Sequence, residues 1–547
     1  MTHHGNSVVT ISAKNGSCKT GLQFAKNVLL LAHGLIGLGL KRGGVVAISA
    51  LNSDLYLEWM LAVAYVGGVV APLNYRWSLE EAILAMNQVR PVMLVIDSSS
   101  NYWHSGFRVE LIPSLLWKVL MDTNGDQDCS FCDMLTTESL RTVSSKFASF
   151  SPCWAQEDGE GVVLICFTSG TTGRPKGVMI NHIALIVQSL AKLEIVGYRE
   201  DDIYLHTAPL CHIGGISSAM AMLMVGGCHV FIPKFDAISA IDAITHYQVT
   251  SMITVPTMMA DIVYTFKRKK IGNGLESMKK VLNGGGSLTL QSIEETINIF
   301  PKARLISAYG MTEACSSLTF KTLYDPKDEK SIGNQKSTSI FQSGGVCVGK
   351  PAPHIELRIE VENSSHVGRI LTRGPHVMIG YWGNFQLDAT NPINEGWLDT
   401  GDIGQIDGDG DLWLVGRNKG RIKSGGENIY PEEVENVLLQ HPGVAAVVVV
   451  GVPDTRLTEM VVACVHIKDD WRWVEFSSTS PRNQNSEYLS ANILQQFCKE
   501  MNMTGFKIPR RFVPWKSPFP VTSTGKIKRE QVRTDVSSNL NESLSKL

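Results

Sequence analysis

The chain has 547 residues, of which 44% are hydrophobic and 19% charged, and its formal net charge at pH 7 is -2. This composition is typical of a globular protein and excludes a disordered chain. The near-neutral charge gives no indication of binding to nucleic acid or to an anionic membrane. A single core rarely organises so long a chain, so we expect two or more domains. Of the 11 cysteines only Cys129 and Cys132 form a close pair, and we interpret them as reduced thiols.

Helix-like and strand-like segments alternate through the first half of the chain. Apolar residues recur at helical spacing over residues 21–40, and the apolar run 43–50 is typical of a buried strand. A helix over 55–69 and a strand over 92–97 follow. Similar units recur as far as residue 285, with strands expected at 161–167, 229–233, 251–256 and 279–285 and helices at 184–193 and 239–246. The alternation predicts an α/β fold built on mostly parallel sheets.

The longest stretch without Asp, Glu, Lys or Arg covers residues 203–233. Its apolar middle, 213–228, is interrupted by glycines and serines, whereas a membrane-spanning helix needs about 20 predominantly apolar residues. We therefore interpret 213–228 as a buried helix followed by a strand, and we predict no transmembrane segment.

The pattern changes near residue 345, where short strand-like runs are separated by Gly, Pro, Asn and Asp. A smaller unit begins near residue 417, with helices expected at 431–439 and 489–501 and strands at 445–452 and 461–466. We predict an N-terminal domain over residues 1–416, a C-terminal domain over 417–535 and a polar tail over 536–547.

The segment TSGTTGRPKG, residues 168–177, directly follows a predicted strand, at the strand end where α/β sheets place their ligands. Its glycines let backbone amides approach an anion, its hydroxyls supply further hydrogen-bond donors, and Lys176 adds a positive charge. The spacing does not fit the Walker A pattern G-x-x-x-x-G-K-[ST]. We interpret the segment as a loop that holds a polyphosphate.

This loop resembles the phosphate loop of the adenylate-forming superfamily, which includes acyl-CoA synthetases, peptide-synthetase adenylation domains and luciferases. Four further motifs follow in the order of that superfamily: YGMTE (309–313), WLDTGD (397–402), GRNKGRIKSGGENIYPEEVE (416–435) and PVTSTGKIKR (520–529). The resemblance implies an AMP-forming acid–CoA ligase. It also implies a large N-terminal domain of stacked, mostly parallel sheets with a β-barrel-like subdomain, and a small mobile α+β C-terminal domain.

The resemblance also implies roles for individual residues, with ATP, Mg²⁺ and CoA as the ligands. The expected catalytic residues are Lys526, His212, Thr312 and Glu313, of which Glu313 would also hold the metal. The expected ATP-binding residues are Thr168, Ser169, Gly170, Thr171, Thr172, Lys176, Gly284, Gly285, Tyr309, Asp402 and Arg417. Lys419 would be the hinge between the domains, and the CoA channel would be lined by Lys423, Ser424, Gly425 and Gly426. The expected acid pocket comprises Ser217, Ser218, Thr257, Gly310 and Ser316, and Ser317 is a further candidate.

The segments around the motifs resemble the family of plant 2-succinylbenzoate–CoA ligases of phylloquinone biosynthesis, particularly residues 71–82, 204–227, 454–465 and 505–513. On that resemblance the succinyl carboxylate is activated, and the aromatic carboxylate needs polar partners. The alternatives are another aryl- or fatty-acid–CoA ligase, a carrier-protein adenylation module, or a luciferase-like oxygenase. The final Ser545-Lys546-Leu547 matches the signal read by the peroxisomal import receptor, so we expect a peroxisomal location, with the chloroplast as an alternative.

Overall fold

The structure is a computed structural model. It describes residues 5–98, 107–122, 134–144, 161–169, 175–269, 275–328, 341–342, 345–361, 366–383, 393–418, 420–424, 427–454, 456–474, 487–501, 503, 505–521 and 527–544. Several residues with predicted roles lie outside this part of the chain: Cys129 and Cys132, Gly170 to Thr172, Lys419, Gly425, Gly426, Lys526 and Ser545 to Leu547.

An eight-stranded sheet forms the N-terminal part of the molecule, in the order β20-β9-β8-β4-β3-β5-β6-β7. The strands from β8 to β7 pair in parallel, while β9 and β20 are antiparallel additions at one edge. Strands β3, β4 and β5 are buried along their whole length, as expected of parallel strands covered on both faces. The bounds are β3 Val45–Ser49, β4 Val69–Pro72, β5 Met93–Ile96, β6 Trp117–Leu120, β7 Leu135–Thr136, β8 Val162–Ser169, β9 Pro175–Asn181 and β20 Gly380–Tyr381.

A fifteen-stranded sheet forms the second layer, along the path β18-β19-β22-β23-β17-β15-β14-β13-β12-β10-β11-β1-β2 with β16 and β21 beside it. Strands β1, β10, β11, β12, β13 and β14 pair in parallel, and the strands from β15 to β18 are antiparallel. The predicted barrel-like part is thus an antiparallel extension of this sheet. The bounds are β1 Val8–Ser12, β2 Cys18–Thr20, β10 Ile203–His206, β11 Cys228–Phe231, β12 Ser251–Thr254, β13 Lys280–Asn283, β14 Arg304–Met311, β15 Ser316–Tyr324, β16 Phe341–Gln342, β17 Gly345–Pro351, β18 Glu356–Glu360, β19 Gly368–Arg373, β21 Ile393–Asn394, β22 Trp397–Ile406 and β23 Leu412–Arg417.

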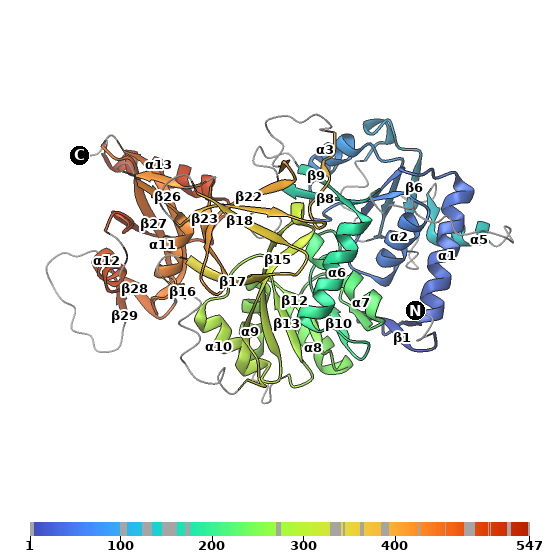
Figure 1. The fold of residues 1–547 in the computed structure, drawn as a ribbon, viewed down its shortest axis with the longest axis horizontal. Helices are drawn as coiled ribbons and strands as arrows, with labels where there is room; N and C mark the ends of the chain where they lie inside the picture. The colour runs from blue at the N-terminus through green and yellow to red at the C-terminus, as the bar shows by residue number, and fades with distance from the viewer. Residues whose placement is uncertain are drawn as a thin grey trace.

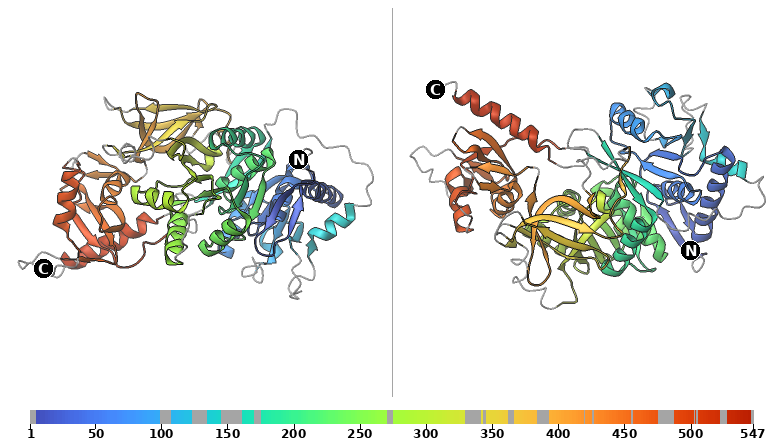
Figure 2. Two further views of the ribbon diagram at one scale, coloured as in Figure 1. Left: turned by 90° about the horizontal axis from the view of Figure 1, so that it is seen from below. Right: turned by 45° about the horizontal axis from the view of Figure 1, so that its top comes forward.

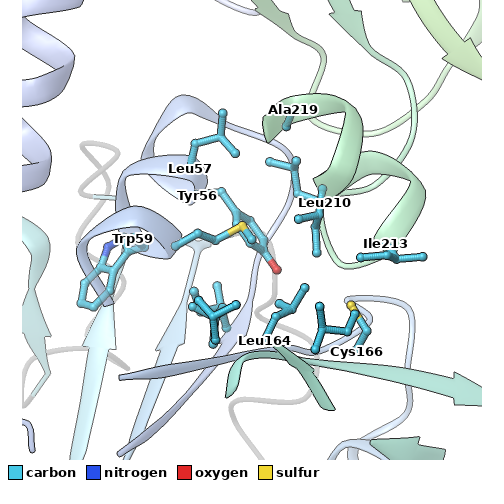
Figure 3. Close-up of a cluster of buried hydrophobic side chains, with 14 of the residues drawn as sticks. Tyr56, Leu57, Trp59, Leu164, Cys166, Leu210, Ile213 and Ala219 are labelled. Carbon is cyan, nitrogen blue, oxygen red and sulfur yellow. The ribbon is translucent and has the colours of Figure 1, made fainter. Parts of the chain in front are cut away.

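Helices fill the space between the two sheets and cover their outer faces (Figure 1). The largest core joins both sheets to α1 (Gly21–Leu38), α2 (Asp54–Tyr65), α6 (His182–Val196) and α7 (Ile213–Val225). Figure 3 shows part of this core, where Tyr56 of α2 points toward Leu164 of β8 and Leu210 before α7, while Trp59 lies on the other side of α2. The outer faces are covered by α3 (Leu79–Val89) on the first sheet, and on the second by α8 (Ala237–Tyr247), α9 (Pro256–Arg268) and α10 (Leu290–Ile299).

One helix of the first layers is shorter than the sequence predicts. The predicted helix 55–69 is shorter, because Gly67 adopts a φ of 77° after α2 and the following residues join the sheet as β4. Among the described residues, α1 alone is long and apolar enough to cross a membrane. It packs against α2 and against α5 (Thr137–Ser144), with Phe24, Leu31 and Leu35 fully buried, as a core helix of a globular domain does.

A smaller α+β unit follows and lies at one end of the molecule (Figures 1 and 2). Its five-stranded sheet has the order β25-β24-β27-β26, with β30 beside β27. Val532 and Val536 of the last helix pack on the core of this sheet, so the helix crosses the predicted tail boundary at residue 535/536. The bounds are β24 Ile422–Ser424, β25 Glu427–Ile429, β26 Val444–Asp454, β27 Thr458–Ile467, β28 Trp471–Trp473, β29 Glu487–Leu489, β30 Arg511–Pro514, α11 Pro431–Leu438, α12 Ala491–Glu500 and α13 Arg529–Leu544.

Candidate active site

The predicted phosphate loop lies between the paired strands β8 and β9. Thr168 is directly opposite Lys176 in this antiparallel pair, so the hydroxyl and the ammonium flank the two ends of the loop. The Nζ atom of Lys176 lies 4.9 Å from the centre of the Tyr381 ring, in a cation–π contact. Of the loop itself, Gly170, Thr171 and Thr172 lie outside the described residues, as does the side chain of Ser169.

Tyr381 links the phosphate loop to the predicted metal ligand. Its hydroxyl donates a 3.0 Å hydrogen bond to Oε1 of Glu313, which lies with Thr312 in the short 3-10 helix η5 (Thr312–Ala314). Burial raises the pKa of the Tyr381 phenol, and the Glu313 carboxylate adds to the rise, so the phenol stays a donor. Tyr381 lies outside the motifs, so its role could not be predicted from the sequence.

The donor set fits a magnesium ion that arrives with a nucleotide. Mg²⁺ in nucleotide sites is usually held by one or two carboxylates together with phosphate oxygens and water. Glu313 offers one partly exposed carboxylate with an oxygen beyond the Tyr381 hydrogen bond. The described residues contain no cluster of three or more His, Cys, Asp or Glu side chains that would form a closed metal cage.

A second group of predicted residues comes together where β14 faces the β22–β23 pair. The hydroxyl of Tyr309 donates a 2.7 Å hydrogen bond to Oδ2 of Asp402, and Nε of Arg417 lies 3.0 Å from Oδ1 of the same carboxylate. Asp402 is 5% exposed. Burial and the adjacent Asp402 carboxylate raise the pKa of Tyr309. A phenol face, a carboxylate and a guanidinium in one place suit the base, the ribose diol and the phosphate of a nucleotide.

Glycines at the strand ends complete this side of the site. Gly284 and Gly285 follow β13, the parallel neighbour of β14, and the amide of Gly284 donates to the carbonyl of Thr254 at 2.9 Å. Gly310 lies on β14 opposite Ser317, where a Cβ atom would be only 1.7 Å from the carbonyl oxygen of Ser316. A side chain at residue 310 would therefore push β14 and β15 apart.

We expect Gly310→Ala to abolish most adenylate formation, because a contact of 1.7 Å cannot be relieved without moving the backbone of both strands. Overpacking of this kind typically costs about 1–3 kcal/mol or more, and it would displace Tyr309 and Thr312 as well. Pyrophosphate exchange and thermal unfolding are the measurements. Gly408→Ala is the control, since nothing lies within 4 Å of a Cβ atom at that exposed hairpin residue. Full activity of Gly310→Ala would contradict the tight strand pairing.

The predicted acid-pocket serines surround Lys192, a residue that belongs to none of the motifs. Nζ of Lys192, on α6, donates to Oγ of Ser217 and lies 3.2 Å from Oγ of Ser218 and 3.1 Å from Oγ of Ser316. Thr257 is exposed at the start of α9 and is not part of this group. His212 precedes α7 as its N-cap residue, five residues before Ser217.

The sequence contains a signal for Lys192, but it is a weak one. Buried positions recur four residues apart along α6, at Ala184, Gln188, Lys192 and Val196, so the lysine lies on the apolar face of the helix. Burial lowers the pKa of Lys192 to about 7. Most lysines are exposed, and a single chain gives no reason to expect this one inside.

Two of the residues expected to meet CoA, Lys423 and Ser424, lie in the C-terminal unit on β24. Lys423 is exposed and its amide donates to Oε2 of Glu459, while Ser424 is 7% exposed and pairs with Thr458. Lys419, Gly425, Gly426 and Lys526 lie outside the described residues. The described contacts therefore group Lys176 with Glu313, Tyr309 with Asp402 and Arg417, and the three serines with Lys192.

Both parts of the chain match known protein families. Residues 2–382 match the model of the AMP-binding enzyme family, and residues 433–526 match that of its C-terminal domain. The chain belongs to the AMP-binding enzymes. The predicted adenylate-forming superfamily is thus confirmed, and so is the mixed α/β fold of large sheets.

Individual relatives of this AMP-binding enzyme cover almost its whole length. The chain is 54% identical to the chloroplastic/peroxisomal 2-succinylbenzoate–CoA ligase of Arabidopsis thaliana, over 98% of this chain and 95% of the relative. It is 31% identical to an indoleacetate–CoA ligase of Aromatoleum aromaticum, over 93% and 92% of the two chains. Among solved structures, the o-succinylbenzoate CoA synthetase of Bacillus subtilis in complex with an acyl-adenylate superposes with a TM-score of 0.74 at 25% identity, covering 97% of this chain and 96% of that one.

Proposed function

We propose that this protein joins 2-succinylbenzoate to CoA at the expense of ATP, through an acyl-adenylate, in phylloquinone biosynthesis. The observation that supports this most strongly is the 54% identity with the Arabidopsis ligase over nearly the full length of both chains. The contacts of Tyr309, Asp402 and Arg417 and those of Tyr381, Glu313 and Lys176 fit the binding of MgATP beside an acid.

In the first half-reaction an oxygen of the succinyl carboxylate bonds to the α-phosphorus of ATP, and the bond from that phosphorus to the β-phosphate oxygen breaks to release pyrophosphate. Two anions must approach while charge builds on phosphoryl oxygens, so positioning and charge stabilisation supply most of the rate. Thr168 and Lys176, with Ser169 and Thr172, would hold the β- and γ-phosphates, Arg417 the ribose and phosphate, and Lys526 would bridge the carboxylate and the α-phosphate. Magnesium held by Glu313 would neutralise phosphate charge.

In the second half-reaction the CoA thiol loses its proton, its sulfur bonds to the acyl carbon, and AMP leaves. The thiol must reach the place that Lys526 occupied, so we propose that the C-terminal unit rotates about Lys419. Lys423, Ser424, Gly425 and Gly426 would then line the channel for the pantetheine arm, and His212 would move aside for the thiol.

The test is CoA-dependent AMP release from ATP with 2-succinylbenzoate, cinnamate, benzoate, indoleacetate and a medium-chain fatty acid. We expect kcat/KM to be highest for 2-succinylbenzoate. Indoleacetate is included because a relative that is 31% identical acts on that acid by its name. A preference for any of the other acids would keep the ligase chemistry and reject the naphthoquinone assignment.

We also propose that the protein enters the peroxisome through Ser545-Lys546-Leu547. The name of the Arabidopsis relative, chloroplastic/peroxisomal, supports one of these two organelles. A fluorescent protein fused ahead of the chain should appear in peroxisomes, and deletion of Leu547 should leave it in the cytosol. Plastid fluorescence that persists after the deletion would reject the peroxisomal route.

A further inference from the structure

Lys192 is a fully buried lysine in the core of the N-terminal domain. It is 0% exposed, and in the part of the chain that the structure describes no carboxylate forms an ion pair with it. A buried ammonium without a counter-ion is costly, because neutral hydroxyls repay only part of the lost hydration. The fold holds this lysine firmly in place: Asn181 caps the start of α6, and Gly197 ends the helix with a φ of 75°.

Three serine oxygens accept hydrogen bonds from Lys192, which leaves the proton of each hydroxyl free to be donated to another group. An ammonium group has three protons and no acceptor, so all three bonds run from Nζ to the oxygens of Ser217, Ser218 and Ser316. Each hydroxyl must then point its own proton elsewhere. Ser218 also contacts the phenols of Tyr198 and Tyr204. The remaining contacts of Ser217 and Ser316 are long, at 3.5 Å from Ser217 Oγ to the carbonyl of Gly214 and 3.5 Å between Ser316 Oγ and Ser317 Oγ. Serine hydroxyls that can donate hydrogen bonds next to a positively charged ammonium group are suited to binding an anion.

The cluster formed by Lys192, Ser217, Ser218 and Ser316 adjoins the strand of the YGMTE motif, because Ser316 lies on the neighbouring strand. Ser316 is opposite Met311, and Ser317 is opposite Gly310, on the paired strands β15 and β14. Ser316 has a φ of 107°, and Cys315 before it a φ of 52°. Such strained conformations in residues other than glycine persist where the surroundings enforce them, and they are frequent at ligand sites. Ser316 and Ser317 are themselves buried, at 8% and 5% exposed, but they pair with the strand that carries the exposed Gly310.

We propose that Lys192, Ser217, Ser218 and Ser316 form the subsite for the second, aromatic carboxylate of the acid. The carboxylate accepts a hydrogen bond from the Ser316 hydroxyl, and Lys192 supplies the charge behind it as a positioning and specificity-determining residue. This inference rests on the proposed function, because an acid with one carboxylate would leave the subsite empty. Thr257 and His212 have no part in it.

None of the titratable groups named here as neighbours of Lys192 carries a negative charge that could balance its ammonium group. Burial raises the pKa of the Cys315 thiol to about 12, and burial also raises the pKa values of the Tyr198 and Tyr204 phenols near Ser218, so all three groups are neutral at pH 7. Burial holds the pKa of Lys192 itself at about 7, and a bound carboxylate would raise it. Binding of the diacid above pH 7 therefore takes up a proton, and its KM should rise by up to tenfold per pH unit.

The experiment compares 2-succinylbenzoate with 4-oxo-4-phenylbutanoate, the same molecule without the aromatic carboxylate. Lys192→Met keeps the length of the side chain and removes its charge. We expect kcat/KM for the diacid to fall roughly 10²–10³-fold, mainly through KM, because a buried charge pair loses one partner. Activity on the monoacid should be unchanged or higher, and Ser316→Ala should lower diacid activity about tenfold.

The control is Ser189→Ala, which removes a buried hydroxyl of α6 that bonds only the carbonyl of Leu185 in its own helix. It should leave both acids unaffected. Thermal unfolding reports the fold: Lys192→Met should unfold no lower than the wild type at pH 6, where the buried charge is present. Its advantage should shrink towards pH 9, because the burial cost fades as the pH rises from about 7 towards the pKa of an unfolded lysine.

The outcomes separate the subsite from the proposed function. If the wild type does not prefer the diacid to the monoacid, both the assignment of the acid and the subsite fail. If the wild type prefers the diacid and Lys192→Met keeps that preference, the subsite alone is wrong. Equal losses on both acids, or a diacid KM in the wild type that does not change with pH, would likewise reject the role of Lys192.

Discussion

Lys526→Ala is expected to slow adenylate formation roughly 10²–10³-fold, the usual effect of removing one preorganised donor from a developing oxyanion. The lysine would bridge the attacking carboxylate and the α-phosphate, so its loss should act on the first half-reaction. Thioester formation from a presynthesised acyl-adenylate should change little, because the proposed rotation takes Lys526 away from the thiol. Pyrophosphate exchange measures the first half-reaction, and single-turnover thioester formation measures the second.

The residues around Lys526 are well anchored, which makes this a test of chemistry rather than of folding. Ile527 pairs with Val521, and the guanidinium of Arg529 binds Glu435, Glu432 and the carbonyl of Val449. Lys528→Ala is the matched control, since its side chain is exposed. It should retain both half-reactions. An equal loss in both half-reactions for Lys526→Ala would contradict the proposal that Lys526 acts only in adenylate formation.

Asp402→Asn is expected to lower kcat/KM for ATP roughly 10–150-fold. The buried carboxylate accepts from Tyr309 and Arg417 and would accept from the ribose hydroxyls, and the amide loses the charge and offers donors where acceptors are needed. Hydrogen bonds to a charged group contribute about 1.5–3 kcal/mol each. The loss should appear mainly in the KM for ATP, measured at saturating acid and CoA.

Two further variants show whether the effect of Asp402→Asn is specific to the buried carboxylate. Tyr309→Phe removes only one of the donors to Asp402 and should cost about tenfold or less. Asp409→Asn, in the exposed turn between β22 and β23, should leave the KM for ATP unchanged. An Asp402→Asn enzyme with a normal KM for ATP and a raised KM for the acid would place this carboxylate in the acid site instead.

The sequence by itself determined the family, the reaction type and the fold class. The phosphate loop and the YGMTE and WLDTGD motifs are contiguous, so their residue types and spacing are visible without a fold. The strands of the first layer are also local patterns, because a run such as Val45–Ser49 must be buried on both faces wherever it pairs. For the same reason the helix over 184–193 was predicted, and the structure has it at His182–Val196.

The tertiary structure alone decided which residues meet. Lys192 and Ser316 are 124 residues apart, and Tyr381 reaches Glu313 over 68 residues, so neither pair belongs to a motif. Burial of a lysine is a property of the packed helices and not of its neighbours in sequence, and the same packing left Thr257 exposed. Local side-chain patterns specify elements and contiguous motifs, whereas the partners of a buried charge are set by the way distant elements pack together.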